Sequence, residues 1–145
     1  MNKNIIAEFE KKDIFARMDI HNNLSATNDV EMIKTYFSDF GIKNVTIAQA
    51  IAFNNNTPSD ILLELVKEDR YLKNVLSNPN TPMDVLLPYA VLQEHGSFKN
   101  KMSILANPNV SNELLEILSK DELGMVFWEA RHIQEKRLQT NSAKI

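Results

Sequence analysis

The chain has no cysteine, only three glycines and a single tryptophan among its 145 residues. Without cysteine there can be no disulfides, no thiolate catalysis, and no zinc or iron–sulfur site with cysteine ligands. The few glycines are scattered, so no glycine-rich phosphate loop is present. No apolar run is long enough to span a membrane, and the first residues lack the apolar core of a secretory signal peptide. These absences predict a cytoplasmic protein without cofactors, metal ions or a membrane partner.

The charge of the chain bears on its partners. The net charge is −3 at pH 7, and acidic residues outnumber basic ones between residues 42 and 122. Nucleic-acid binding usually requires a concentrated basic surface, so we expect no nucleic-acid partner. Apolar residues make up 43% of the chain and charged residues 24%, which is typical of a soluble globular domain.

One pattern occurs three times along the chain. It spans residues 54–63, returns 24 residues later at 78–87, and returns in a degenerate form at 107–115. The first two copies share Asn-x-Asn-Thr-Pro, followed two residues later by Asp and a run of apolar residues. Self-similarity at a period of about 20 to 50 residues is typical of solenoid proteins.

Each copy predicts a loop that starts a helix. Thr57 and Thr81 are expected to be N-cap residues, with the proline after each at the first helical position. In the third copy Val110 replaces the threonine, so we expect Asn109 to cap that helix. Loop asparagines tolerate turn conformations and bond to their own backbone, so we assign Asn54, Asn78 and Asn107 to loop architecture.

Apolar residues recur at helical spacing on both sides of each loop. Segments 47–52, 71–76 and 100–105 precede the loops and suit one or two helical turns. Each unit is therefore expected to be a helix, a tight turn, a short second helix and an asparagine loop, with stacking of units burying the apolar faces. The predicted core residues of the helices after the loops are Ile61, Leu62, Leu65, Val66, Val85, Leu86, Tyr89, Ala90, Leu114, Leu115, Ile117 and Leu118.

The segment from Val75 to Leu87, Val-Leu-Ser-Asn-Pro-Asn-Thr-Pro-Met-Asp-Val-Leu-Leu, resembles the leucine-rich repeat variant (LRV) family. The resemblance covers residues from about 45 to 120. It implies a right-handed superhelix of α-helices alternating with shorter, 3₁₀-like helices. Some members of the family carry an iron–sulfur cluster on an added cysteine-rich segment, and a chain without cysteine cannot share that function.

We therefore predict an all-α fold: a short right-handed α-solenoid of helix pairs, of LRV or HEAT-like type, with terminal capping helices. The solenoid forms a single domain over residues 1–145. Residues 1–44 are an N-terminal cap with a degenerate repeat, and residues 45–120 are the regular repeats. Residues 121–138 form a closing helix, and residues 139–145 a frayed tail.

Smaller features complete this prediction. Residues 3–20 suit one or two amphipathic helices, and a helix over about 28–38 ends at Gly41 as its C-cap. Pro88 falls inside the helix after the second loop and is expected to kink or shorten it.

Three carboxylates, Asp60, Glu64 and Glu68, lie four residues apart and are expected to form one stripe of a helix. The stripe is either a solvated face or an acidic surface for a basic partner. As a catalytic pair these residues would need a cleft, which the sequence does not show.

The connection at 93–99 is five residues longer than its counterpart and contains Glu94, His95 and Phe98. An insertion in one repeat often projects on the binding face, although this one could also accommodate Pro88. Phe127 is expected in the core. Its neighbour Trp128 is either buried, the favoured alternative, or an exposed anchor for a partner.

No catalytic constellation is visible, so we predict a non-enzymatic protein-binding module. Its size and charge suggest a small inhibitor of a basic protein, of the toxin-neutralising or anti-defence type. The alternatives are a nucleic-acid-binding HEAT-like solenoid and a structural subunit of a larger assembly. The candidate partner-binding residues are Asp60, Glu64, Glu68, Glu94, His95, Phe98 and Trp128.

Overall fold

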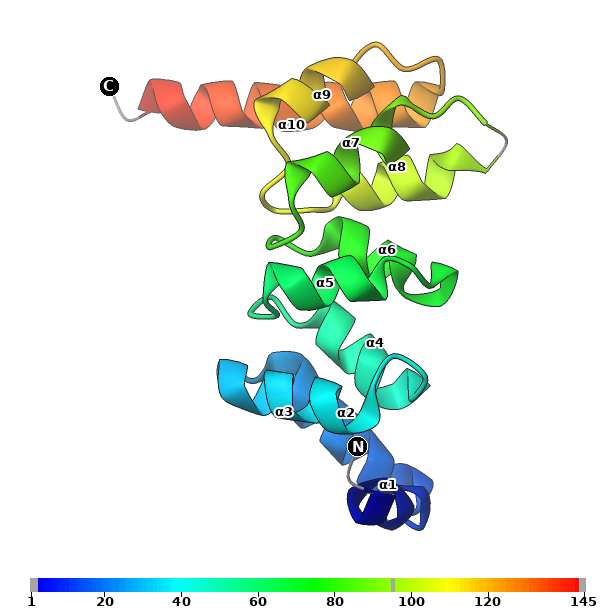
Figure 1. The fold of residues 1–145 in the computed structure, drawn as a ribbon. Helices are drawn as coiled ribbons and strands as arrows, with labels where there is room; N and C mark the ends of the chain where they lie inside the picture. Colours follow the sequence, from blue (N-terminus) through cyan, green and yellow to red (C-terminus); the bar gives the residue numbers. More distant parts are fainter. Residues whose placement is uncertain (1–2, 95, 144–145) are drawn as a thin grey trace. The chain divides into compact units, whose positions relative to one another are not determined.

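The computed structural model describes residues 3–94 and 96–143, and every regular element in these ranges is an α-helix (Figure 1). The predicted all-α class is confirmed, whereas a solenoid forming a single domain stays a prediction. The chain divides into two compact units, Met1–Thr81 and Pro82–Ile145. The first contains α1 (Lys3–Glu10), α2 (Ile14–Ala26), α3 (Val30–Phe40), α4 (Val45–Phe53), α5 (Ser59–Leu65) and α6 (Asp69–Ser77). The second contains α7 (Met83–Val91), α8 (Ser97–Leu105), α9 (Asn112–Leu118) and α10 (Gly124–Ala143).

Helix α4 is the centre of the first unit and packs against α2, α3, α5 and α6. A helix that is apolar on nearly all sides belongs in a core. Five of its residues are buried: Ile47, Ala48, Ala50, Ile51 and Ala52. Side chains from the surrounding helices complete this core, among them Leu24, Ile33, Leu62 and Val75.

The N-terminal region forms two helices before the first predicted repeat helix. The side chain of Asp13 caps α2 by accepting from the N–H of Ala16 at 2.8 Å. Helix α3 matches the helix predicted over about 28–38. It ends at Gly41, whose φ of 67° lies in the left-handed region and whose N–H donates to Phe37 O. The predicted glycine C-cap is confirmed.

The helices after the first two loops begin differently from the prediction. Pro58 and Pro82 are the N-cap residues of α5 and α7, and no side chain caps either helix. Thr57 and Thr81 are buried, and each donates its hydroxyl to a carbonyl in the last turn of the preceding helix, Ile51 for Thr57. The predicted threonine N-caps are wrong, because these hydroxyls satisfy C-terminal carbonyls of one helix instead of N–H groups of the next.

Asn54 and Asn78 join consecutive loops of the first unit. The amide Nδ2 of Asn54 donates to the carbonyls of Leu24 and Thr27, at 2.7 and 2.8 Å. The amide Nδ2 of Asn78 donates to the carbonyls of Ala52 and Asn54, at 2.9 and 2.8 Å. Each Oδ1 accepts from the backbone N–H two residues further on. Both side chains are buried and bonded to backbone, which confirms their architectural role.

The third loop has the same asparagine turn as the first two, but the helix after it is capped differently. Asn107 Oδ1 accepts from the N–H of Asn109 at 2.9 Å. Ser111 caps α9 by accepting from the N–H of Leu114 at 3.1 Å, so the expectation that Asn109 caps this helix is wrong. Val110 is buried at the position that threonine holds in the other loops.

In the second unit α7 packs against α8 and α9, and α10 packs against α8 and α9. Its buried apolar residues are Leu86, Ala90, Ile104, Leu105, Val110, Leu114, Leu115, Leu118, Val126 and Ala130. The core also contains an ion pair: Lys101 Nζ lies 2.5 Å from Asp121 Oδ2, and the two side chains are 0% and 2% exposed. This pair fixes α8 to the turn between α9 and α10.

Several predicted helix lengths are wrong. Helix α7 continues past Pro88 to Val91 and has nine residues against seven in α5, so the proline does not shorten it, while the alternative of a kink at Pro88 stays a prediction. The second helix of a pair is not the shorter one, since α6 and α8 have nine residues each. Residues 3–94 and 96–143 contain no 3₁₀-helix.

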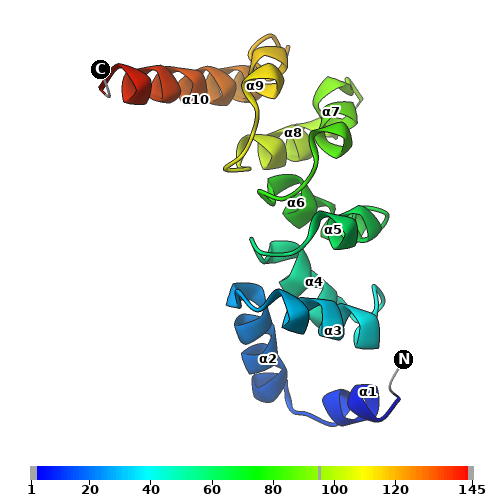
Figure 2. The same cartoon turned by 60° about the vertical axis from the view of Figure 1, so that its left-hand side comes forward.

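The closing helix is longer than expected. Helix α10 begins at Gly124 and extends to Ala143, so residues 139–143 are helical and the predicted frayed tail is wrong there. Residues 144–145 lie outside the described residues. The last turns of α10 project beyond α9 (Figure 2).

Candidate interaction surfaces

The predicted acidic stripe is divided between two elements. Asp60 and Glu64 lie on α5, which ends before Glu68, the N-cap residue of α6. A single helical stripe is therefore wrong. Lys67 Nζ lies 3.0 Å from Glu64 Oε1, and Arg70 Nε lies 3.9 Å from Glu68 Oε2. Because cations accompany two of the three carboxylates, this surface fits the solvated-face interpretation better than an acidic patch.

The last three residues of the predicted insertion, 97–99, are the start of a helix. Helix α8 begins at Ser97, after Gly96 at a left-handed φ of 97°, so the projecting loop is shorter than expected. Glu94 is exposed in the loop, and Phe98 is 40% exposed in the first turn of α8. His95 lies outside the described residues.

Trp128 is 71% exposed on α10, so its favoured burial is wrong and the exposed-anchor alternative remains. The buried face of α10 contains Val126 and Ala130. At about 100° per residue Trp128 stands some 200° around the helix from Val126, on the other side. Phe127 is half-buried, and the guanidinium of Arg131 lies 4.7 Å from the centre of its ring.

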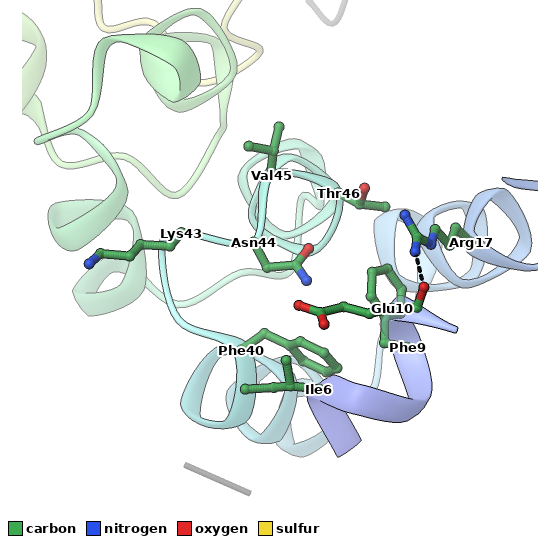
Figure 3. A pocket seen from close by; sticks show the side chains of 9 residues that line it. All are labelled: Ile6, Phe9, Glu10, Arg17, Phe40, Lys43, Asn44, Val45 and Thr46. Atoms are coloured by element: carbon green, nitrogen blue, oxygen red, sulfur yellow. Dashed lines mark hydrogen bonds between the residues drawn. The ribbon is translucent and has the colours of Figure 1, made fainter. Parts of the chain in front are cut away.

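A pocket of about 390 Å³ lies among α1, α3 and the start of α4 (Figure 3). Phe9 and Phe40 supply its apolar wall, with ring centroids 5.3 Å apart. Arg17 donates to the backbone carbonyl of Glu10 and lies 5.5 Å from the ring of Phe9, while its buried Nε has no hydrogen-bond partner among the described residues. Figure 3 shows the Glu10 carboxylate directed toward Asn44. The lining of this pocket includes one carboxylate, that of Glu10, together with the side chains of Lys43 and Thr46.

No group of three or more histidine, aspartate or glutamate side chains is placed to hold a metal ion within residues 3–94 and 96–143. His21 lies on α2 in the first unit and His132 on α10 in the second. None of the helices in the described part of the chain is long and apolar enough to cross a membrane.

An exposed apolar cluster on α2 was not predicted from the sequence. Ile14, Phe15 and Met18 of α2 are 67%, 75% and 52% exposed. They fall within about 100° of the helix circumference, on a different face from the buried Leu24. The sequence does contain the signal, three large apolar residues that follow Lys11, Lys12 and Asp13, but amphipathic spacing alone predicts a buried face.

The chain was compared with protein-family models, curated proteins and solved structures. No family model, no curated protein and no solved structure matches this chain. Only the chain's own residues therefore bear on its function.

Proposed function

We propose that the protein is a non-enzymatic protein-binding module made of helical repeats, and that the apolar face of α2 is where a partner protein docks. The observation that carries the proposal is the exposure of Ile14, Phe15 and Met18 on one face. Single exposed apolar residues are normal, whereas a contiguous exposed cluster marks an interaction site. Large aromatic side chains such as Phe15 supply much of the energy at such sites.

The helix is well suited to present this face rigidly. Asp13 caps its first turn, and its last turns are held by Leu24, which is fully buried and whose carbonyl accepts from Asn54. A face held in place before binding loses little conformational entropy on docking. Lys11 and Lys12 are exposed beside it and add positive charge at the edge of the surface.

The finer architecture belongs to the same proposal. Helix pairs joined by Asn-x-Asn loops, with asparagine amides bonding from loop to loop in the first unit, support a right-handed α-solenoid, although residues 3–94 and 96–143 contain none of the 3₁₀-like helices that the LRV resemblance implies. Solenoids present extended surfaces to macromolecules. In a narrower form of the proposal the chain is a small inhibitor of a basic protein that binds to carboxylates. The net charge of −3 supports this form, whereas the exposed Lys11 and Lys12 beside the apolar face of α2 do not.

The experiment is capture of partners by the tagged protein from its native host, followed by mass spectrometry. The wild-type chain should retain a stoichiometric protein that Phe15→Ser loses. Phe53→Ser is the matched control, because Phe53 is 62% exposed at the end of α4, away from the first turns of α2. Equal capture by Phe15→Ser and wild type removes α2 as the docking face.

Salt separates the two forms of the proposal. Docking on an apolar face should survive moderate salt, whereas binding of a basic protein through carboxylates should weaken as salt screens the charges. Co-elution of nucleic acid that is lost at moderate salt would contradict both forms.

A further inference from the structure

Helix α10 presents an exposed stripe on the side away from its buried residue Ala130. Trp128 and Leu138 are 71% and 66% exposed. Arg131 and Glu135 are exposed between them, so the four residues follow one another at spacings of three, four and three. This spacing places them along one face of a helix, as in the seam of a coiled coil. We call these four residues the outer seam.

The two charges of the outer seam are not paired with each other. Arg131 and Glu135 are four residues apart, but no ion pair joins them, and Arg131 instead lies over the ring of Phe127. Arginine on the N-terminal side of glutamate is the less favourable order for such a pair. Within the described part of the chain Glu135 has no hydrogen bond or ion pair. Arg131 is exposed beside Phe127 and Glu116, and Glu135 is exposed without an ion pair among the described residues, so both side chains would face a partner on this stripe.

The outer seam is complementary to itself when a second α10 runs antiparallel. Trp128 and Leu138 lie five residues on either side of Ile133, and Arg131 and Glu135 lie two residues on either side of it. A twofold axis at the level of Ile133 places Trp128 against Leu138 of the second copy, and Arg131 against Glu135 of the second copy, each contact twice. A parallel arrangement would instead place like charges together. Self-complementarity about a twofold axis is what a symmetric dimer requires.

Two open hollows lie beside the seam, one near each of its apolar ends. One of about 220 Å³ lies beside Trp128, and another of about 280 Å³ lies beside Leu138. In the antiparallel arrangement Leu138 of the second copy enters the first hollow, and the indole of the second copy enters the other.

The rim of the second hollow is compatible with such a contact. An ion pair lies there: Lys120 Nζ, in the turn after α9, is 3.1 Å from Glu116 Oε1 on α9. The hydrogen bond from Lys120 lowers the pKa of Glu116, so this rim carries a balanced pair of charges at neutral pH and repels neither charge of an incoming copy.

We infer that the outer seam of α10 is a self-association surface on which a second copy of this chain docks antiparallel. About three helical turns bury less area than a standard stable interface. The dimer is accordingly weak, with a dissociation constant on the order of micromolar or above. This inference is independent of the docking face on α2.

The first measurement is sedimentation velocity over a range up to millimolar protein, together with tryptophan fluorescence. Because Trp128 is the single tryptophan, its emission reports directly on the seam. The average mass should rise toward that of a dimer with concentration, and the emission should shift to shorter wavelength over the same range as the indole leaves water.

Charge reversal tests the antiparallel pairing. Arg131→Glu places the introduced carboxylate against Glu135 of the second copy, and Glu135→Arg places two guanidinium groups together, so each variant should stay monomeric. Mixing the two single variants should restore association. In the mixed dimer the two carboxylates of Arg131→Glu face the two guanidinium groups of Glu135→Arg, so both facing pairs are of opposite charge. The double variant R131E/E135R should likewise dimerise, since each facing pair is again of opposite charge.

Lys136→Glu is the control, since Lys136 is exposed on α10 outside the seam and its reversal should leave association unchanged. Circular dichroism of each variant checks that α10 is intact. A wild-type chain that stays monomeric at millimolar concentration, with constant emission, overturns the inference and leaves Trp128 as a contact for a different protein. Association that persists in R131E overturns the antiparallel pairing.

Discussion

The two units of the chain bury polar groups in different ways. In the first unit the buried polar side chains are neutral, and they bond mainly to backbone carbonyls: Asn54, Asn78, Thr57 and Thr81 all do so. In the second unit a lysine and an aspartate are buried against each other. Neutral groups need only hydrogen bonds to be buried at low cost, whereas each buried charge also needs its counter-charge. The second unit should therefore be the more sensitive to loss of a single side chain.

The three asparagine loops share their backbone hydrogen bonds but differ between the two units in one buried side chain. In all three the first asparagine's Oδ1 accepts from the N–H two residues on, and its carbonyl accepts from the N–H three residues on. The fourth position then varies. A threonine hydroxyl bonds back to the preceding helix in the first unit, whereas in the second unit Val110 packs as a buried apolar residue and its carbonyl accepts from Arg137 of α10 at 2.7 Å. The hydrogen bonds of the asparagine define the backbone of the loop. This backbone is the same whether the fourth residue is a polar threonine or an apolar valine.

The largest effect is expected from Asp121→Ala in the second unit. It leaves the ammonium of Lys101 buried without its counter-charge and removes the Oδ1 that accepts from the N–H of Leu123 at 2.9 Å. Breaking a buried pair in this way costs about 3–5 kcal/mol, which urea unfolding would measure. The double variant Lys101→Met/Asp121→Leu should recover most of the loss, because no lone charge remains. A loss below about 1 kcal/mol in the single variant would show that water reaches the lysine.

A smaller effect is expected from Asn54→Ala in the first unit. The change removes the amide donor of the Leu24 carbonyl, leaves the Thr27 carbonyl with only the amide of Asn56, and removes the acceptor of the Asn56 N–H. Stranding buried polar groups costs about 1–3 kcal/mol. The control is Asn55→Ala. Because the Asn55 side chain is exposed, this change should alter the free energy of unfolding by no more than about 0.5 kcal/mol. If the two variants unfold at the same urea concentration, the amide bonds of the loop contribute nothing net.

Sequence reasoning was reliable where one local pattern decides the structure. Helical spacing located the helix pairs, and Gly41 marked the end of α3. The predicted core residues Leu62, Leu86 and Leu114 are all buried. These features depend on neighbours within a few residues of the chain, which is the information that periodicity contains.

The predictions were wrong where the partner or the burial of a side chain depends on a distant part of the chain. Thr57 suits an N-cap by its neighbours, but its hydroxyl instead donates to the carbonyl of Ile51 at the end of the preceding helix. Burial of Lys101 depends on Asp121, 20 residues away. Trp128 is exposed because smaller residues of α10 face α8 and α9. The candidate surface on α2 was missed for the same reason, since an apolar face is exposed only when no other helix covers it.

The smallest expected effect concerns pH and the buried tyrosine of the first unit. Tyr71 donates its hydroxyl to the carbonyl of Ile42 at 2.6 Å, and burial raises the pKa of this hydroxyl above its ordinary value of 10.0. A raised folded-state pKa means that the folded chain holds the proton more tightly than the unfolded chain. The stabilisation is therefore fully present below about pH 10 and is lost as the pH rises through the folded-state pKa.

The variant Tyr71→Phe isolates this contribution. At neutral pH it should unfold about 1 kcal/mol more easily than wild type, because the carbonyl of Ile42 loses its donor. Denaturant unfolding of both proteins at neutral pH and again above about pH 10 would show the gap narrowing, since only wild type has this hydroxyl to ionise. A gap that stays constant or widens with pH would mean that the phenolate is as well accommodated in the folded unit as in water. The first unit would then resemble the second in tolerating a charge in its core.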